Sequence, residues 1–466
     1  MKIKHFLTAA VAVVAFAFSV RAVSAAEAVP LSLTIQSPDN SEALKDNSYD
    51  TVASFKSGDE ITVQSETPMS GVYLKWNSPV SAYTVNCNGR TYNGGQYGFL
   101  HEYIKFDAPA AECTITLTAD MQMCDILAYS EGELPADVQL WEPPCEGKAD
   151  VLVFSTHADD EILFMGGVLA TYGGQQKNNI QVAYMTTYWD GARIREHEKL
   201  DGIWHTGVRI YPVNSSFPDL YADSLESAMG VYNYSEILCY ITEQIRRFKP
   251  MVCVTQDLNG EYGHGGHMIL AKAVCEAVDN SAKDTFEPAS AAKYGVYEVP
   301  KTYLHLYPEN VLTMDLRQPL SALGGKTALE IATEAYKKHV SQQWCWFYVS
   351  DENEYSCSKF GLYKTTVGSD TGSNMLEHIT TYKEIEAKEE ESRRAAEAES
   401  ESIRQSEEAS VSEAESLSKA AAEKESDTPK KDNGTIKVLI IIAAVLVIVL
   451  LMLLLFSLSK RRKRGV

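Results

Sequence analysis

Residues 151–161 read VLVFSTHADDE, and this stretch decides both the fold and the chemistry that we expect of the chain. Its first part, Val151–Ser155, is a short apolar run of the kind that forms a buried strand. An imidazole, His157, and three consecutive carboxylates, Asp159–Glu161, follow almost at once. Like charges side by side repel one another and resist burial. The stretch therefore predicts a compensating cation at the end of a strand, and a metal ion is the first candidate.

A second polar cluster lies about a hundred residues further along, where residues 261–267 read EYGHGGH. It follows a strand that we expect at Met251–Thr255 and a loop over Gln256–Gly260. Both clusters therefore come after the C-terminal end of a predicted parallel strand and before a helix. In open α/β sheets this is the edge at which sites form.

The spacing within the two clusters favours a metal site. His157 and Asp160 are three residues apart, as are His264 and His267, so each pair points to one side of a turn that enters a helix. Two imidazoles and one carboxylate leave a fourth tetrahedral position open for water, which is the mark of catalytic zinc. Asp159 is then the candidate general base. One His–Asp pair alone would be read as a helix cap, and the second cluster is what favours the metal.

The part of the chain that carries both clusters, residues 147–385, alternates strand and helix patterns. This alternation predicts an α/β fold with a Rossmann-like, mostly parallel sheet and helices on both faces. The expected strands are Val151–Ser155, Ile180–Thr186, Val208–Val213, Met251–Thr255 and Phe360–Val367. The expected helices follow Glu161, cover Arg193–Trp204, Glu236–Phe248 and Lys326–His339, and start at His267.

Residues 27–146 show short alternating runs separated by turn residues, which predicts an all-β sandwich of the galactose-binding-like type. Aromatic and polar residues in its expected loops could line a carbohydrate site, and they could equally belong to its core and rim. These residues are Tyr92, Tyr97, His101 and Tyr103.

The two ends of the chain predict a single-pass surface protein. Residues 1–26 have the three-part layout of a signal peptide, and 435–459 are apolar over the length of a bilayer core. The basic tail 460–466 predicts a cytoplasmic C-terminus and an extracellular bulk at the cell membrane. The acidic, Glu/Ala/Ser-rich segment 386–434 predicts a solvated stalk rather than a partner-binding coiled coil.

Charge and cysteine content add two expectations. The net charge of −21 argues against a nucleic-acid partner. Nine cysteines suit an exported chain. The layout and the signal sequence favour a bacterial protein, and Asn-X-Ser/Thr triplets leave an endomembrane location open. Cys87, Cys113, Cys124 and Cys145 could form two disulfides, and Cys345 could pair with Cys357. Inert buried thiols are expected at Cys239, Cys253 and Cys275.

The two His-containing motifs give residues 149–385 a resemblance to the PIG-L/LmbE-like zinc-dependent N-acetylglucosaminyl de-N-acetylases. Thr156–Glu161 is similar to the family's (Ala/Ser)-His-Pro-Asp-Asp-Glu, and Gly263–His267 to its Gly-His-Pro-Asp-His. Weaker similarities lie at Arg195–Val208, followed by Phe217-Pro218-Asp219, and at Tyr336–Gln342.

The resemblance implies a role for each residue of the site. It implies Zn²⁺ held by His157, Asp160 and His267, with Asp159 as general base. His264 would stabilise the tetrahedral intermediate or protonate the leaving amine, and Tyr262 would donate to the developing oxyanion. Glu161 would support the metal ligands from behind. Arg195 and Asp219 would hold sugar hydroxyls, and they could equally form ordinary ion pairs.

Three residues depart from the family pattern. Ala158 replaces the usual Pro, Thr156 replaces a smaller residue, and Gly266 replaces the Asp before the last His. That Asp could tune the neighbouring imidazole, which puts acid catalysis by His264 in doubt. The implied ligands and base are all present, which favours an active enzyme.

The leading hypothesis is a surface-anchored zinc hydrolase that removes acetyl from an N-acetylated amino sugar in a glycan or conjugate. One alternative is a glycan-binding surface protein in which the α/β domain is a degenerate scaffold. The other is a zinc amidase that acts on a non-sugar acetamide.

Overall fold

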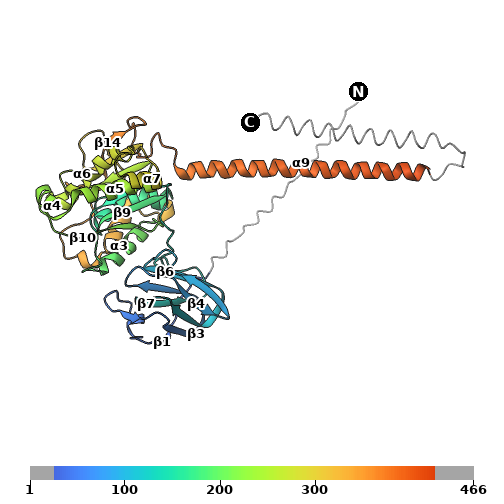
Figure 1. The fold of residues 1–466 in the computed structure, drawn as a ribbon, viewed down its shortest axis with the longest axis horizontal. Helices are drawn as coiled ribbons and strands as arrows, with labels where there is room; N and C mark the ends of the chain where they lie inside the picture. Colours follow the sequence, from blue (N-terminus) through green and yellow to red (C-terminus); the bar gives the residue numbers. More distant parts are fainter. Residues whose placement is uncertain (1–25, 426–466) are drawn as a thin grey trace, which may run out of the picture. The chain divides into compact units, whose positions relative to one another are not determined.

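The computed structural model describes residues 26–425, and these divide into two units between Ala387 and Lys388 (Figure 1). The expected signal peptide falls outside the described residues except for Ala26. The apolar segment 435–459 and the basic tail also lie outside them. Among the described helices, none is both long and apolar enough to cross a membrane.

The first domain is all-β, as expected. Its seven strands form one hydrogen-bonded antiparallel sheet in the order β2-β7-β3-β6-β4-β5, with β1 beside β3. The strands are β1 (Thr34–Gln36), β2 (Ala53–Phe55), β3 (Glu60–Trp76), β4 (Tyr83–Cys87), β5 (Arg90–Gly94), β6 (His101–Leu117) and β7 (Met121–Tyr129), with the short helix η1 (Ala43–Lys45) between β1 and β2.

Continuous strands replace the two separate sheets of a simple sandwich. The runs expected at 60–64 and 71–76 are one 17-residue strand, β3, which pairs along its length with β6. The register between them shifts between Gln64 and Gly71. Such irregularities bend a strand, so that one sheet can curl and enclose a core on its own.

The second domain is a seven-stranded, mostly parallel sheet in the order β10-β9-β8-β11-β12-β14-β13. Five strands pair in parallel, and at one edge β14 pairs antiparallel with both β12 and β13. The strands are β8 (Val151–Ser155), β9 (Ile180–Thr187), β10 (Val213–Pro218), β11 (Val252–Thr255), β12 (Lys301–His305), β13 (Val311–Thr313) and β14 (Lys359–Thr365).

Helices cover both faces of this sheet, which confirms the expected layering. Val151 and Val153 of β8 pack in one apolar cluster with α1, α2, α3 and α8, whereas Leu152 and Phe154 pack in another with α4, α5 and α6. The helices are α1 (Asp160–Leu163), α2 (Gly166–Val168), η2 (Leu169–Gln175), α3 (Ile194–His205), α4 (Leu225–Val231), α5 (Tyr234–Phe248), η3 (Glu261–Gly263), α6 (Gly265–Asn280), α7 (Pro288–Tyr294), η4 (Ser321–Leu323), α8 (Ala328–Tyr336) and η5 (Val340–Gln342).

One expected strand was misplaced. Val208–Val213 is not a strand, and β10 begins at Val213. Val208 and Ile210 are buried for another reason, since this stretch passes beside the segment that connects β7 to β8 and makes a bridge from Ile210 to Glu142 of that segment. Apolar alternation here reflects packing between segments and not membership of the sheet.

The two domains meet through buried polar contacts on α3. His101 Nε2 of β6 lies 2.8 Å from His197 Nδ1, and the Tyr49 ring stacks on the His197 ring at 4.2 Å. The Tyr49 hydroxyl donates to Asp201 Oδ2 at 3.1 Å. Burial lowers the pKa of both histidines, that of His197 to about 3, so these contacts join neutral imidazoles at physiological pH.

The predicted stalk begins as a long helix, α9 (Tyr382–Glu425). Its described side chains beyond residue 390 are exposed, and several Arg–Glu pairs, such as Arg404 with Glu401 and Glu408, lie one turn apart along it. A helix that is polar all round, with charge pairs of this kind, is a solvated helix.

The disulfides suggested by the sequence are not formed. All nine cysteines are free, and Cys253, Cys275 and Cys357 are buried. The inert buried thiol expected at Cys239 is instead half-buried. Cys87 and Cys113 lie close enough on neighbouring strands for the Cys87 charge to raise the pKa of Cys113, although burial is the larger cause.

Candidate metal centre

The two His-containing motifs meet at the C-terminal ends of neighbouring parallel strands. β8 and β11 are adjacent at the centre of the sheet, and the chain turns to opposite sides of it from this point. His157–Asp160 follow β8, and His264–His267 follow β11. Strand order therefore brings together side chains that are about a hundred residues apart in sequence, at the position where α/β sheets bind ligands.

Three ligand atoms converge on one point. Asp160 Oδ2 lies 2.8 Å from His157 Nδ1 and 3.1 Å from His267 Nε2, and the two nitrogens are 3.2 Å apart. The His157 backbone N–H also donates to Asp160 Oδ2, at 2.9 Å. All three residues are buried. Atoms bound to one tetrahedral zinc at its usual bond lengths lie about 3.3 Å apart, so this triangle is close to the size that the ion requires.

The charge of the cluster also suits a divalent cation. Burial disfavours protonated imidazole, but the Asp160 carboxylate outweighs it and raises the pKa of His157 to about 10 and that of His267 to about 9. Two protons thus neutralise the buried carboxylates around them. A divalent cation carries the same charge as those two protons, and it would replace them without a change in net charge.

His264 offers a second possible ligand set. Its ring nitrogen lies within 4.8 Å of those of His157 and His267, so three imidazoles could also surround an ion. However, His264 Nδ1 accepts a hydrogen bond from the Gly266 backbone N–H at 3.1 Å, and the side chain is less buried than the other two. Asp160 is nearer to both buried imidazoles, and we therefore favour Asp160 as the third ligand.

Glu261 holds the ligand His267 from behind, a role that sequence reasoning missed. Its Oε2 lies 2.7 Å from His267 Nδ1, and its Oε1 lies 2.6 Å from His305 Nδ1. His305, the last residue of β12, in turn reaches the Ser356 carbonyl at 3.0 Å. Burial alone would raise the pKa of Glu261, but its two histidine partners lower it to about 2. A carboxylate in this position fixes the tautomer and orientation of a ligating imidazole.

Asp159 sits in a strained backbone conformation beside the ligands. Its φ is +133°, its N–H donates to Glu161 Oε2 at 2.9 Å, and Arg195 Nη2 lies 3.3 Å from its Oδ1. Burial raises the pKa of Asp159 above its usual range, and the Arg195 charge opposes that rise. Strain of this kind costs about 1–3 kcal/mol and persists where the surroundings impose it, as they do here.

Arg195 and Asp219 both reach the centre. Arg195 donates to the Ala158 carbonyl at 2.6 Å, and its Nη1 lies 3.6 Å from Asp219 Oδ2. Asp219, directly after β10, lies 3.4 Å from His157 Nε2. Arg195 is therefore engaged with the chain around Asp159, whereas Asp219 remains partly exposed. The carbonyl of Ala158, the residue that departs from the family pattern, is the acceptor that fixes Arg195.

One imidazole, His264, and one aromatic ring, Tyr262, complete the rim of the candidate metal centre. Burial, with the charges of His157 and His267, lowers the pKa of His264 to about 3. Since its Nδ1 is an acceptor, the proton of the neutral ring resides on Nε2. Tyr262 has a left-handed backbone (φ +47°), and its ring lies 5.3 Å from the His267 ring. Burial, together with Asp160 and Asp159, raises the pKa of Tyr262 well above its usual range, so it remains a donor.

Glu161 lies behind Asp159, where the sequence placed it. Its Oε1 is 3.4 Å from His339 Nε2, and both side chains are fully buried. His339 belongs to the segment Tyr336–Gln342, which the family resemblance included without a role. His339 and His305 are the residues that contact the carboxylates of Glu161 and Glu261 behind the metal centre. The presence of a histidine at these positions was the only sequence signal for these contacts.

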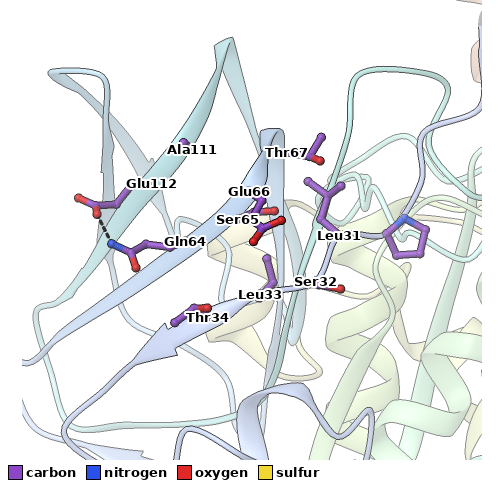
Figure 2. Close-up of a pocket in the computed structure, with 11 residues that line it drawn as sticks. Leu31, Ser32, Leu33, Thr34, Gln64, Ser65, Glu66, Thr67, Ala111 and Glu112 are labelled. Atoms are coloured by element: carbon purple, nitrogen blue, oxygen red, sulfur yellow. Dashed lines mark hydrogen bonds between the residues drawn. The ribbon is translucent and has the colours of Figure 1, made fainter.

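A separate cavity of about 640 Å³ in the β domain contains none of these residues (Figure 2). It is lined mostly by small and polar side chains, which are Pro30–Thr34, Gln64–Thr67, Ala111 and Glu112. Tyr92, Tyr97, His101 and Tyr103 do not line it. His101 is instead fully buried at the contact with α3. Of the two roles expected for His101, a carbohydrate site or the core, the structure supports the core.

Comparison with known proteins identifies a family domain and two curated relatives. Residues 152–278 match the family model PIG-L, GlcNAc-PI de-N-acetylase. A 1D-myo-inositol 2-acetamido-2-deoxy-alpha-D-glucopyranoside deacetylase 1 of Catenulispora acidiphila is 22% identical over 219 residues, which are 40% of this chain and 64% of that protein. The corresponding deacetylase of Geodermatophilus obscurus is 34% identical over 89 residues, 19% of this chain and 29% of that protein.

A solved structure is similar as well. An N,N'-diacetylchitobiose deacetylase from Pyrococcus horikoshii is 19% identical, with 42% of this chain and 71% of that chain covered and a TM-score of 0.33. The chain spans less than two thirds of the length of either curated relative. Residues 152–278 are therefore a PIG-L domain, the domain of the GlcNAc-PI de-N-acetylase family.

Proposed function

We propose that the chain is a zinc-dependent de-N-acetylase that hydrolyses the acetamide of an N-acetylated amino sugar. The observation that carries this proposal is the buried convergence of His157, Asp160 and His267. Beside them lies Asp159, which has a strained backbone and is paired with Arg195. The PIG-L match and the names of the curated relatives, which are deacetylases of an acetamido sugar, support it.

His157, Asp160 and His267 would hold the zinc ion. The chemistry that zinc supplies when bound at such a site is activation of water as a nucleophile and polarisation of a carbonyl. Glu261 keeps the Nδ1 proton of His267 directed at itself, so that Nε2 is free as a ligand atom. The three protein ligands leave room for water and substrate, as catalytic zinc sites do.

Asp159 acts as the general base. Burial holds its pKa above that of a solvated carboxylate, which brings it nearer to neutrality and makes it a better proton acceptor. The Arg195 guanidinium and the Asp159 N–H···Glu161 bond hold the side chain in place. Arg195 is therefore a positioning residue in this mechanism, and Asp219 is the more exposed group that would meet a sugar hydroxyl.

His264 and Tyr262 stabilise the oxygen of the acetamide as it becomes negative. The neutral His264 ring donates from Nε2, and Tyr262 remains protonated and can donate from its hydroxyl. Donors fixed before the reaction are the most effective stabilisers of such a charge. The Gly266 N–H donates to His264 Nδ1 and thereby fixes the tautomer of the ring.

The reaction balances with water alone. Water adds to the acetamide carbonyl and gives its proton to Asp159. The carbon–nitrogen bond then breaks, the proton moves to the leaving nitrogen, and acetate and a free amino sugar are released. As part of the same proposal, this activity lies at the outer face of a bacterial cell membrane and acts on an extracellular glycan. The signal-peptide-like residues 1–26 and the apolar segment 435–459 support this location.

The first prediction concerns the general base. In Asp159→Asn we expect kcat for acetate release from N-acetylglucosamine to fall about 10²–10⁴-fold, because the amide cannot accept the proton. Asp190→Asn is the matched control, since Asp190 is an exposed aspartate outside the site. Acetate is measured by a coupled assay on the full chain. Full activity in Asp159→Asn would contradict the mechanism, and faster hydrolysis of a non-sugar acetamide would favour the amidase alternative.

The second prediction concerns the support of His267. Glu261→Gln removes the charge that orients this ligand, and we expect zinc affinity to fall about 10–100-fold. Competition with a zinc chelator measures the affinity, and circular dichroism establishes that the variant is folded. Glu226→Gln, at an exposed position in α4, is the control. Equal affinities in the two variants would remove Glu261 from the metal centre.

The third prediction is the pH dependence of zinc binding. The raised pKa values of His157 and His267 mean that both rings are protonated near pH 7 without metal, so zinc must displace both protons. Affinity should therefore rise with pH, by up to about tenfold per unit for each proton displaced. Calorimetry in buffers of different ionisation enthalpy counts the released protons. Binding that releases none would show that these imidazoles are not the ligands.

A further inference from the structure

An exposed aromatic segment borders the candidate metal centre. Trp344, Trp346 and Tyr348 alternate along residues 344–348 and are 83%, 66% and 61% exposed. Large aromatic side chains are usually well buried, and a cluster left in solvent marks a surface that binds something. The catalytic mechanism above uses none of the three.

This segment is connected to the centre by ring contacts. The Phe347 ring stacks on Tyr262 at 4.4 Å with an interplanar angle of 29°. The Trp346 ring lies 4.4 Å from Phe347 and 6.3 Å from Tyr262. Tyr262 itself lies 5.3 Å from the His267 ring. An unbroken aromatic path therefore runs from a proposed metal ligand to an exposed tryptophan.

A second exposed ring lies at the centre from another segment. Tyr221 is 78% exposed, and its ring is 5.8 Å from the His264 ring, edge to face. It follows Asp219 by two residues, after β10, whereas Trp344 and Trp346 follow η5. The two groups of rings belong to different segments and contact different histidine-motif residues, Tyr221 with His264 and Trp346 with Tyr262.

The charge around the segment argues against a membrane surface as its partner. Residues 340–358 contain no Lys or Arg. Arg317, from outside the segment, pairs with Asp351 and Glu352, and Glu354 adds a further negative charge. Surfaces that bind anionic lipids are rich in basic residues. A neutral ligand with flat apolar faces and polar edges fits exposed aromatic rings on a segment without basic residues, and a pyranose ring has that character.

We infer that Trp344, Trp346 and Tyr221 stack against sugar rings that flank the residue being deacetylated, so the substrate is an oligosaccharide or polysaccharide and not a small conjugate. This inference rests on the proposed function. It names the substrate class of the same site, and it gives the exposed aromatic segment a role in binding rather than in chemistry.

The test compares N-acetylglucosamine with its β-1,4-linked tetramer on the full chain. We expect the tetramer to have a kcat/KM at least tenfold above the monomer, mainly through KM. In Trp344→Ala/Trp346→Ala we expect that ratio to fall at least tenfold, as loss of a stacked ring does at other aromatic platforms. Tyr97→Ala, which removes a 53% exposed ring from the β domain, is the matched control and should keep the ratio.

Equal kcat/KM values for tetramer and monomer, or equal loss on both substrates in the double variant, would overturn the inference while leaving the deacetylase intact. A fall in the ratio with Tyr97→Ala alone would assign glycan binding to the β domain and would also overturn it. Quenching of Trp344 or Trp346 fluorescence by brominated lipid in nanodiscs would identify a membrane partner instead.

Binding of the tetramer, measured by calorimetry with Asp159→Asn, separates the inference from the proposed function. Binding that is lost in the triple variant with Trp344→Ala and Trp346→Ala supports the aromatic platform even if the chain releases no acetate. Absence of tetramer binding, beside zinc-dependent release of acetate from the monomer, refutes the platform alone.

Discussion

A carboxylate buried between two imidazoles is the interaction on which the rest of this site depends. Asp160 lies within 3.1 Å of ligand atoms from both His157 and His267, in a place that water does not reach. Such a group needs positive charge, and protons or a divalent cation can supply it. The central position of β8 beside β11 makes this geometry possible, and Glu261 and His305 extend it into the core. The strain at Asp159 is tolerated because Glu161 holds its backbone N–H and Arg195 holds its carboxylate.

The helix α3 links the β domain to the metal centre. Near its start, Arg195 holds the chain around Asp159, and one turn later His197 and Asp201 contact His101 and Tyr49 of the β domain. Burial lowers the pKa of both imidazoles, so they stay neutral, whereas burial raises the pKa of Asp201 to about 6, so the Tyr49–Asp201 contact titrates near neutral pH. The β domain thus packs against the helix that carries Arg195.

Much of the site could be predicted from the sequence because its residues lie in short motifs directly after apolar strand runs. The run Val151–Ser155 matches β8 residue for residue, and both His motifs fall at strand ends, as parallel-sheet geometry requires. Contacts between distant segments carry no such local signal. Glu261 belongs to the EYGHGGH cluster, but its role depends on a contact with His305, at the end of β12, which the sequence did not predict as a strand. Val208–Val213 was wrongly predicted as a strand, because residues that pack against the segment around Glu142 show the same apolar alternation as a strand.

The ligand set of the metal is the central claim, and X-ray absorption spectroscopy of the zinc-loaded chain tests it most directly. Our account predicts two imidazole ligands with the remaining positions filled by oxygen, and a spectrum that His264→Ala leaves unchanged. Three imidazole ligands, with one lost in His264→Ala and none in Asp160→Asn, would contradict it. That result would place His264 on the metal and assign Asp160 to the proton network around it.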